Sequence, residues 1–291
     1  MDVDSPLGER ISRFWAAYRG GSAVYLPLVI ADSGHQVSNG SVSFATTYRR
    51  MVDNELGRPP LAEVEAYSRR VGNAVRVWAR VTNTSSATLS FARNGAAVHA
   101  LVWEDAMVGV TSRMVRAASW RSVLTDLAPG EVATFTLETL SLANVNWDKV
   151  HTLVAVDYRP GGATGAYDML QASVASPAEL AVAPETLRLA DDPGNPSARA
   201  AVAELRGPHV LSWTASTDSP WLAVTPGAGA LPAQATVSLI AEVFPGGTQT
   251  GRVTFTATSG DGLSSSAVVV VSAERVSPPH PLRRRLRRVG S

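Results

Sequence analysis

The sequence predicts an all-β protein made of two immunoglobulin-like β-sandwiches in tandem. The chain has 291 residues, a length typical of about two domains. Charged residues are 18% of the chain, below the roughly 25% of an average globular protein, and small and β-branched residues take their place. The 23 glycines and 18 prolines supply the many tight turns that a strand-rich protein needs.

Residues 1–22 are predicted to be an N-terminal helix and linker. Ile11, Phe14, Trp15 and Tyr18 recur at helical spacing over residues 9–19, and glycines at 20 and 21 can end the helix. A helix this short is marginal alone in water. We therefore expect it to pack on the first sandwich, or on an upstream domain that this chain lacks.

Residues 23–176 form the first predicted sandwich. Its clearest strand is Ala74–Thr82, where valines and alanine alternate with polar or aromatic residues at the period of two typical of a strand. Asn94-Gly95 predicts a hairpin turn, and Tyr48–Leu61 is expected to be a loop that crosses between sheets. The other predicted strands are Thr88–Phe91, Ala97–Glu104, Thr111–Ala118, Glu131–Leu140, Lys149–Tyr158 and Tyr167–Val174.

Residues 177–276 form the second predicted sandwich. Turn signals recur there every 8–12 residues or so, which is typical of a small sandwich. Residues 277–291 are rich in proline and arginine and are expected to be a disordered tail. The predicted strands are Thr186–Ala190, Ala198–Leu205, His209–Ser216, Trp221–Thr225, Ala235–Glu242, Gly251–Thr258 and Ser264–Ala273.

The second sandwich resembles the BACON family of small bacterial β-sandwich modules. The segment Trp221–Gly229 carries a Trp-Leu-x-Val-x-Pro-x-x-Gly pattern, preceded by Leu211–Ala215 and followed by Gly246, Gly247 and the strand that begins at Gly251. Such modules occur in secreted and surface proteins, often beside carbohydrate-active domains. The resemblance implies a non-enzymatic accessory module outside the cytoplasm.

The first sandwich is similar to bacterial surface immunoglobulin-like modules. Val75–Ser85 fits their pattern of a strand followed by a Thr-Asn-x-Ser turn, and Leu127–Phe135 fits their Leu-x-Pro-Gly-Glu turn before a strand. This likeness also implies an extracellular or cell-surface location. The acidic start of the chain lacks the basic region of a signal peptide, so we expect that the true start lies upstream.

Composition and motifs exclude several classes of chemistry. The chain has no cysteine, so disulfides, thiolate catalysis and Cys-ligated metals are excluded. The signatures of a nucleophile elbow, a zinc protease and a phosphate-binding loop are absent, and no cofactor is expected. Without the five arginines at 283–285, 287 and 288, the formal net charge of +1 becomes −4, which argues against nucleic-acid binding. No apolar run is long enough to span a bilayer.

The histidines and acidic turns give few candidates for a catalytic or metal site. His99 and His151 lie in predicted strands, where an ordinary structural histidine is expected. Asp32 and His35 share a probable turn and could form half of a metal site, but an ordinary polar turn is the favoured explanation. Oxygen-rich turns could bind calcium at Asp191-Asp192 and Asp261, but no spaced series of carboxylates accompanies them. The sequence therefore predicts no metal site.

The aromatic residues give the one candidate ligand surface. If the valines of Ala74–Thr82 face the core, then Arg76, Trp78 and Arg80 face outward, and an exposed Trp could stack on a sugar ring or meet an acidic partner. Trp103 could share this face if the two strands are neighbours. The alternative is that the face is covered by the N-terminal helix or the next domain. Trp213 and Trp221, in contrast, are expected in the core of the second sandwich.

Three functional hypotheses follow from the sequence. The first is a non-catalytic surface or secreted protein that serves as an adhesion module or spacer and binds a glycan or another protein. The second is a carbohydrate-binding accessory of a secreted or surface enzyme system, which requires Trp78 and Trp103 to be exposed on one face. The third is an unrecognised hydrolase, which requires a pocket with a His–carboxylate pair.

Overall fold

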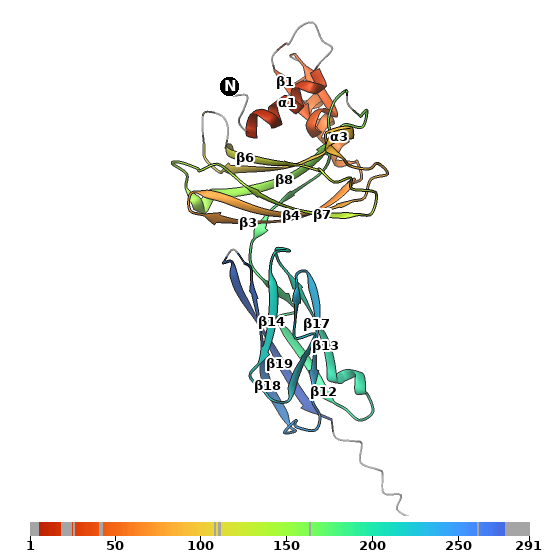
Figure 1. Ribbon diagram of the computed structural model, residues 1–291, viewed down its shortest axis with the longest axis vertical. Helices are drawn as coiled ribbons and strands as arrows, with labels where there is room; N and C mark the ends of the chain where they lie inside the picture. Colours follow the sequence, from red (N-terminus) through yellow and green to blue (C-terminus); the bar gives the residue numbers. More distant parts are fainter. Residues whose placement is uncertain are drawn as a thin grey trace, which may run out of the picture. The chain divides into compact units, whose positions relative to one another are not determined.

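The chain forms two compact units, residues 1–178 and 179–291. The structure, a computed structural model, describes residues 6–18, 25, 27–40, 43–107, 109, 112–162, 164–260 and 262–276. Both units are built mainly of β-strands (Figure 1). The predicted all-β class, with two sandwiches and a short N-terminal helix, is confirmed. The predicted tail, residues 277–291, lies outside the described residues.

The first unit is a sandwich of two four-stranded sheets. The first sheet contains, in spatial order, β10 (Ser176–Pro177), β3 (Ala62–Val71), β4 (Ala74–Asn83) and β7 (Val132–Glu138). The second sheet contains β6 (Met114–Ser122), β5 (Ala97–Glu104), β8 (Val150–Tyr158) and β9 (Asp168–Val174). Hydrogen-bonded neighbours are antiparallel except β10, which pairs with β3 in parallel.

The core between these sheets follows the predicted alternation. Val77 and Ala79 of β4 are fully buried in it, as are Val98 of β5 and Val154 and Val156 of β8. Complete burial of such a side chain stabilises a fold by about 1.5–3 kcal/mol relative to an exposed one. Alternate residues of these strands therefore point away from the core, toward whatever covers the outer faces of the sheets.

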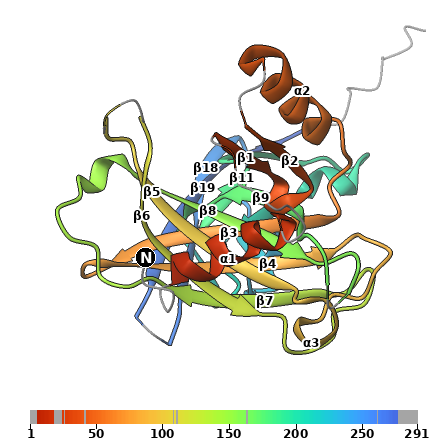
Figure 2. The same ribbon diagram turned by 90° about the horizontal axis from the view of Figure 1, so that it is seen from above.

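A third layer covers the outer face of the second sheet (Figure 2). Its elements are α1 (Pro6–Tyr18), β1 (Leu28–Ala31), the 3-10 turn η1 (Asp32–Gly34), β2 (Gln36–Asn39) and α2 (Phe44–Leu56). The helix predicted at residues 9–19 is confirmed, but its buried face carries Arg10, Arg13 and Ala16. Trp15, which the apolar spacing placed on the packed face, is 46% exposed.

Three local predictions for the first unit were wrong. In place of the predicted strand Thr88–Phe91 there is an isolated bridge between Leu89 and Leu127. The segment expected as a loop holds the second half of α2 and then runs into β3, whose polar side chains hid its alternation. Asn94-Gly95 does not form a two-residue hairpin turn. It ends the short helix α3 (Phe91–Asn94), where Gly95 has a φ of 62° that favours glycine.

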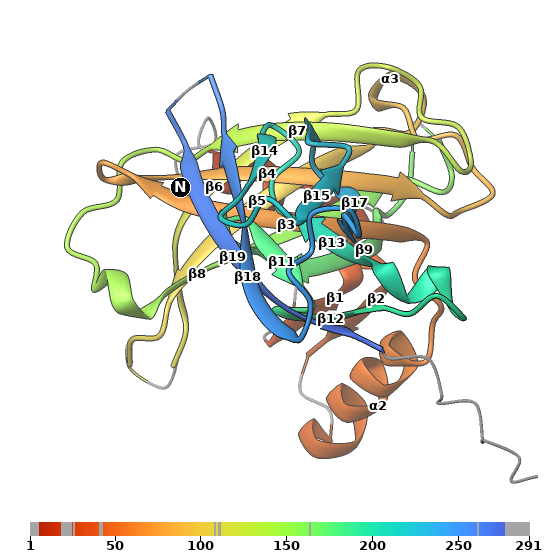
Figure 3. The ribbon, with the colours of Figure 1, turned by 90° about the horizontal axis from the view of Figure 1, so that it is seen from below.

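The second unit is a sandwich of a four-stranded and a five-stranded sheet (Figure 3). The smaller sheet contains, in order, β11 (Ala181–Ala183), β13 (Ala200–Arg206), β17 (Ala233–Leu239) and β15 (Leu222–Thr225). The larger contains β12 (Thr186–Asp191), β19 (Ser264–Arg275), β18 (Thr248–Thr258), β14 (Ser212–Thr217) and β16 (Ala228–Ala230). The seven predicted strands are all present, and the short β11 and β16 were missed.

Two tryptophans fill the core of the second unit, as the sequence predicts. Trp213 is 1% exposed and packs edge-on against Phe255, with ring centroids 5.7 Å apart. Trp221 is 4% exposed and packs against Phe244 at 5.3 Å. A glycine lies close to the Trp221 ring, because a Cβ atom at Gly251 would be 3.0 Å from Trp221 Cζ2 and 2.7 Å from Ser219 Oγ.

We predict that Asn83→Ala destabilises the first unit by about 3 kcal/mol. Asn83 is fully buried, and its side-chain amide donates to Ala87 O at 2.8 Å and Leu127 O at 2.9 Å. Its Oδ1 atom accepts from Ser85 N and Oγ, so the substitution removes four hydrogen bonds from a buried turn. Urea unfolding measures the effect. The control is Ser86→Ala, an exposed residue of the same turn, and an equal effect of both would contradict the prediction.

We predict that Gly251→Ala destabilises the second unit by about 1–3 kcal/mol through overpacking. The added methyl group meets Leu222 Cδ1 at 2.9 Å as well as Trp221 and Ser219, so the core must shift. The matched control is Gly260→Ala, where a Cβ atom meets nothing within 4 Å. Thermal unfolding should separate the two variants, and a Gly251→Ala protein as stable as the control would refute the packing role.

Candidate functional site

The surface predicted from Trp78 and Trp103 does not exist as an exposed platform. Trp78 is only 2% exposed, although its position in β4 points away from the core. Trp103 is half-buried and lies in β5 of the other sheet. Arg76 forms an ion pair with Glu138 on the neighbouring strand, and Arg80 lies 3.7 Å from Glu65. The expectation that the two tryptophans share one exposed face was wrong, because register and sheet assignment separate them.

Trp103 instead stacks on His151. The two rings are 5.2 Å apart at an interplanar angle of 25°, and His151 Nε2 lies 3.0 Å from Asp105 Oδ2. Trp103 Nε1 is buried and has no hydrogen-bond partner among the described residues. This pair fixes the orientation of the imidazole at the start of β8.

His151 lines a pocket of about 330 Å³ at one end of the first sandwich. We call it the end pocket. It opens between β3, β8, β9 and the turn η2 (Trp147–Lys149). The guanidinium carbon of Arg70 lies 4.1 Å from the centroid of the Trp147 ring, a cation–π contact. Arg69, Ser68 and Thr152 also line this pocket.

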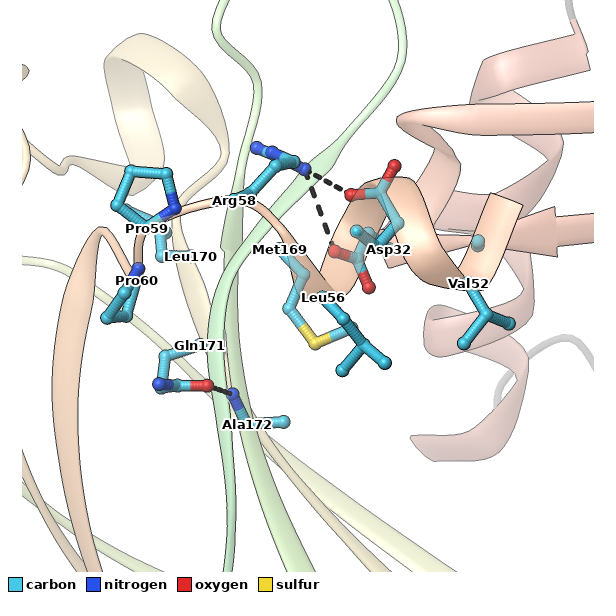
Figure 4. Close-up of a pocket in the computed structure, with 12 residues that line it drawn as sticks. Asp32, Val52, Leu56, Arg58, Pro59, Pro60, Met169, Leu170, Gln171 and Ala172 are labelled. Atoms are coloured by element: carbon cyan, nitrogen blue, oxygen red, sulfur yellow. Dashed lines mark hydrogen bonds and ion pairs between the residues drawn. The ribbon is translucent and has the colours of Figure 1, made fainter. Parts of the chain in front are cut away.

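A second, larger pocket lies where the N-terminal layer meets β9 (Figure 4). We call it the α2 pocket. Its volume is about 410 Å³. Leu56 and Met169 face its open centre, with Pro59 and Pro60 on one side and Asp32 on the other. The pocket thus combines apolar walls with a cluster of charged side chains.

Arg58 is the centre of this charged cluster. Its Nη1 atom donates to Glu55 Oε2 at 2.6 Å and lies 3.6 Å from Asp32 Oδ2, and its Nη2 atom donates to Asp168 Oδ2 at 2.7 Å. His35 Nδ1 lies 2.8 Å from Glu55 Oε1. The hydrogen bonds to Asp168 and Glu55 raise the pKa of Arg58 despite its partial burial.

The two carboxyl groups nearest the pocket have pKa values that are far apart. Burial, together with a hydrogen bond to Glu55, raises the pKa of Asp32 to about 6. Burial alone would raise the pKa of Glu55, but hydrogen bonds from His35 and Arg58 outweigh it and lower this pKa to about 2. Such a pair resembles the acid–base pairs of enzymes, although structural ion networks shift pKa values in the same way.

The backbone at Asp32 and Ser33 has φ values of 45° and 59°, in the left-handed region that few non-glycine residues adopt. Asp tolerates this region better than most residues, since its short side chain can bond locally. The turn that was predicted from sequence is therefore real, and it aims the Asp32 carboxyl at the pocket. The part of the chain that the structure describes contains no cluster of three or more potential metal ligands.

The three histidines considered as catalytic candidates, His35, His99 and His151, each lie near a carboxylate. Besides His35 and His151, the buried His99 has Nε2 3.3 Å from Asp157 Oδ1. The requirement of the hydrolase hypothesis, a pocket with a His–carboxylate pair, is therefore met by His35 and Glu55. Asp191 binds Arg199 and Arg275, so it serves as an ion-pair partner, and Asp261 lies outside the described residues.

Sequence reasoning missed Glu55, Arg58 and Asp168. Arg58 and Asp168 are 110 positions apart, and no motif spacing links them. For the end pocket, Trp147 could be seen in the sequence as an aromatic residue in a polar turn, but only the fold brings Arg70 to its ring. Among the described helices, none is long and apolar enough to cross a membrane.

No curated protein sequence matches the chain. Among solved structures, the Bacteroides ovatus GH5 xyloglucanase in complex with a XXXG heptasaccharide is similar over 35% of this chain and 20% of that chain, with 19% identity and a TM-score of 0.25. A biofilm associated protein BSP domain is similar over 75% of this chain and 30% of its own, with 14% identity and a TM-score of 0.24. Human CDH23 EC21-23 is similar over 62% of both chains, with 11% identity and a TM-score of 0.26. These likenesses carry no argument about function.

The family comparison concerns the second unit alone. The resemblance of the first sandwich to bacterial surface modules stays a prediction. Residues 179–274 match the family model described as the viral BACON domain, which confirms the BACON resemblance that the second sandwich carries in its sequence.

Proposed function

We propose that this chain is a non-catalytic binding protein that works outside the cytoplasm, at a cell or particle surface. The observation that carries the proposal is the match of residues 179–274 to the viral BACON domain. The description of that family as viral adds a virus particle to the surfaces on which such a module could work. In this proposal both sandwiches act as adhesion or spacer modules, and the first unit offers pockets for a ligand.

The geometry of the α2 pocket favours a structural role for its charges. Glu55 and Asp168 each form an ion pair with Arg58. The charges that could act in catalysis are therefore already paired. Ser33, the hydroxyl residue of the same turn, is 1% exposed, and its Oγ atom accepts a hydrogen bond from Arg10 at 2.9 Å. A serine nucleophile needs an accessible hydroxyl beside a base, and Ser33 lacks that exposure.

The carbohydrate-binding hypothesis now depends on the end pocket and no longer on an exposed pair of tryptophans. Trp78 is no longer part of it because this side chain is buried. Trp103 contributes indirectly, since it holds His151 at the edge of the end pocket. The specific observation that favours a ligand there is an aromatic and cationic lining, with Trp147, Arg69 and Arg70 around one opening.

If the charges of the α2 pocket are structural, Asp32→Asn should stabilise the first unit at pH 7–8. The carboxyl has an ordinary pKa of 3.8 and a folded pKa of about 6, so the folded state loses stability as the pH rises through that interval. The shift corresponds to about 3 kcal/mol, and because the carboxyl is 27% exposed we expect about 1 kcal/mol. Asn also tolerates the left-handed φ.

Urea unfolding at pH 3 and pH 7.5 tests this expectation. The gain should be present at pH 7.5 and largely lost near pH 3, below the ordinary pKa of 3.8, where Asp32 is mostly protonated in both states. Asp53→Asn is the matched control, because Asp53 is an exposed carboxylate of α2, the helix that carries Glu55. A loss of stability in Asp32→Asn at pH 7.5 would show that the carboxylate form is needed.

The proposed function predicts saturable binding without turnover. The fluorescently labelled full chain should be retained on a glycan array or on intact bacterial cells, and excess unlabelled chain should displace it. Chromogenic esters and glycosides should not be hydrolysed. Turnover by the wild type that disappears in Glu55→Gln would overturn the non-catalytic assignment, and an absence of retention on every surface would overturn the binding assignment.

A further inference from the structure

The end pocket has the chemistry of an anion site with a stacking surface. In Figure 3 the light green turn that contains Trp147 lies at the end of the first sandwich away from α3. Among the described residues that line the pocket, two are arginines, one is histidine and none is acidic. Arg69 is exposed and has no ion-pair partner among the described residues.

The pocket is held in shape before any ligand arrives. Arg70 Nε donates to Gly72 O at 2.7 Å, which fixes the guanidinium beside the Trp147 ring. The turn η2 is tied down because Asn146 N donates to Glu104 Oε1 at 2.8 Å. Asp105 holds the His151 ring. A preorganised site loses less side-chain entropy when it binds a ligand.

The lining matches a sugar ring that carries a carboxylate. An arginine recognises a carboxylate through charge-assisted hydrogen bonds, and aromatic rings such as Trp147 and His151 offer flat apolar faces. Ser68 and Thr152 add hydroxyl groups that can bond to sugar hydroxyls. A volume of about 330 Å³ is near the lower limit of about 300 Å³ for ligand pockets, which favours one ring of a longer chain.

We propose that the end pocket binds a uronic acid residue of an acidic oligosaccharide, with Arg70 on the carboxylate and Trp147 and His151 beside the ring. This proposal rests on the proposed function, since it names the ligand class of a non-catalytic binding protein. Arg69 precedes Arg70 in β3 and faces the other side of the strand, so it adds positive charge at the rim of the pocket. Binding should therefore weaken as salt screens this exposed pairing.

Isothermal titration of the full chain with trigalacturonic acid tests the proposal. We expect saturable binding, and about tenfold or greater weakening in Arg70→Gln, since hydrogen bonds to charged groups contribute about 1.5–3 kcal/mol. Arg69→Gln, which removes a charge at the rim, should weaken binding by a smaller factor. The matched control is Arg121→Gln, which removes an exposed arginine of β6 outside the pocket and should change the affinity by less than about twofold.

Two further ligands decide the chemical class. The methyl ester of trigalacturonic acid keeps the rings and loses the charge, so it should bind at least tenfold more weakly, in line with a lost charge-assisted hydrogen bond. Triglutamate keeps the charge and loses the rings, and equal affinity for it would overturn the sugar assignment in favour of an acidic peptide. Equal affinity of wild type and Arg70→Gln would overturn the assignment to this pocket.

The outcome also separates this proposal from the proposed function. Retention on glycans or cells without any binding of trigalacturonic acid overturns only the uronate pocket. Binding of trigalacturonic acid that depends on Arg70, in a chain that no glycan or cell surface retains, supports the pocket and overturns the adhesion role.

Discussion

Asp157 lies near the end of β8 with its carboxylate on the outer face of the second sheet, where it is fully buried. An unpaired buried carboxylate costs several kcal/mol, so this face is stable only beneath a layer that supplies cations. Arg10 and Arg13 of α1 provide them, with Arg13 Nη1 2.7 Å from Asp157 Oδ1. Burial alone would raise the pKa of Asp157, but His99 and the two arginines outweigh it and lower the pKa to about 2. The helix is thus a required cover for the sandwich.

The rest of the N-terminal layer is arranged by the same contact. Arg10 also donates to Ser33 Oγ, which links the buried carboxylate to the η1 turn. That turn approaches α1 so closely that a Cβ atom at Gly34 would lie 2.7 Å from Ala17 Cβ. With η1 held there, Asp32 faces Glu55 and Arg58, and the segment after α2 is tied to β9 by the ion pair between Arg58 and Asp168. The α2 pocket follows from this docking, which explains why its charges are paired with one another.

Features that depend on neighbouring residues in the sequence could be predicted, and features that depend on residues far apart in the sequence could not. The strands of both sandwiches and the core positions of β4 were readable, because alternation is a local pattern. The burial of Trp78 was not readable, since it depends on what covers the outer face of β4. The β3 strand was missed because glutamates, a serine and two arginines interrupt its apolar alternation. The pairing of Arg10 with Asp157 spans 147 positions, and charge carries no periodicity that would reveal such a partner.

The two pockets of the first unit differ in how their charges are balanced, and this difference decides their roles. In the α2 pocket, Arg58 contacts three carboxylates, so an incoming charged ligand would have to break existing ion pairs. In the end pocket, Arg70 is held by a backbone carbonyl and an aromatic ring, neither of which neutralises it. Arg69 adds a second cation within the same opening. A site that lacks its counter-charge gains the most from a ligand that brings one, and the end pocket is for that reason the better place to seek the ligand.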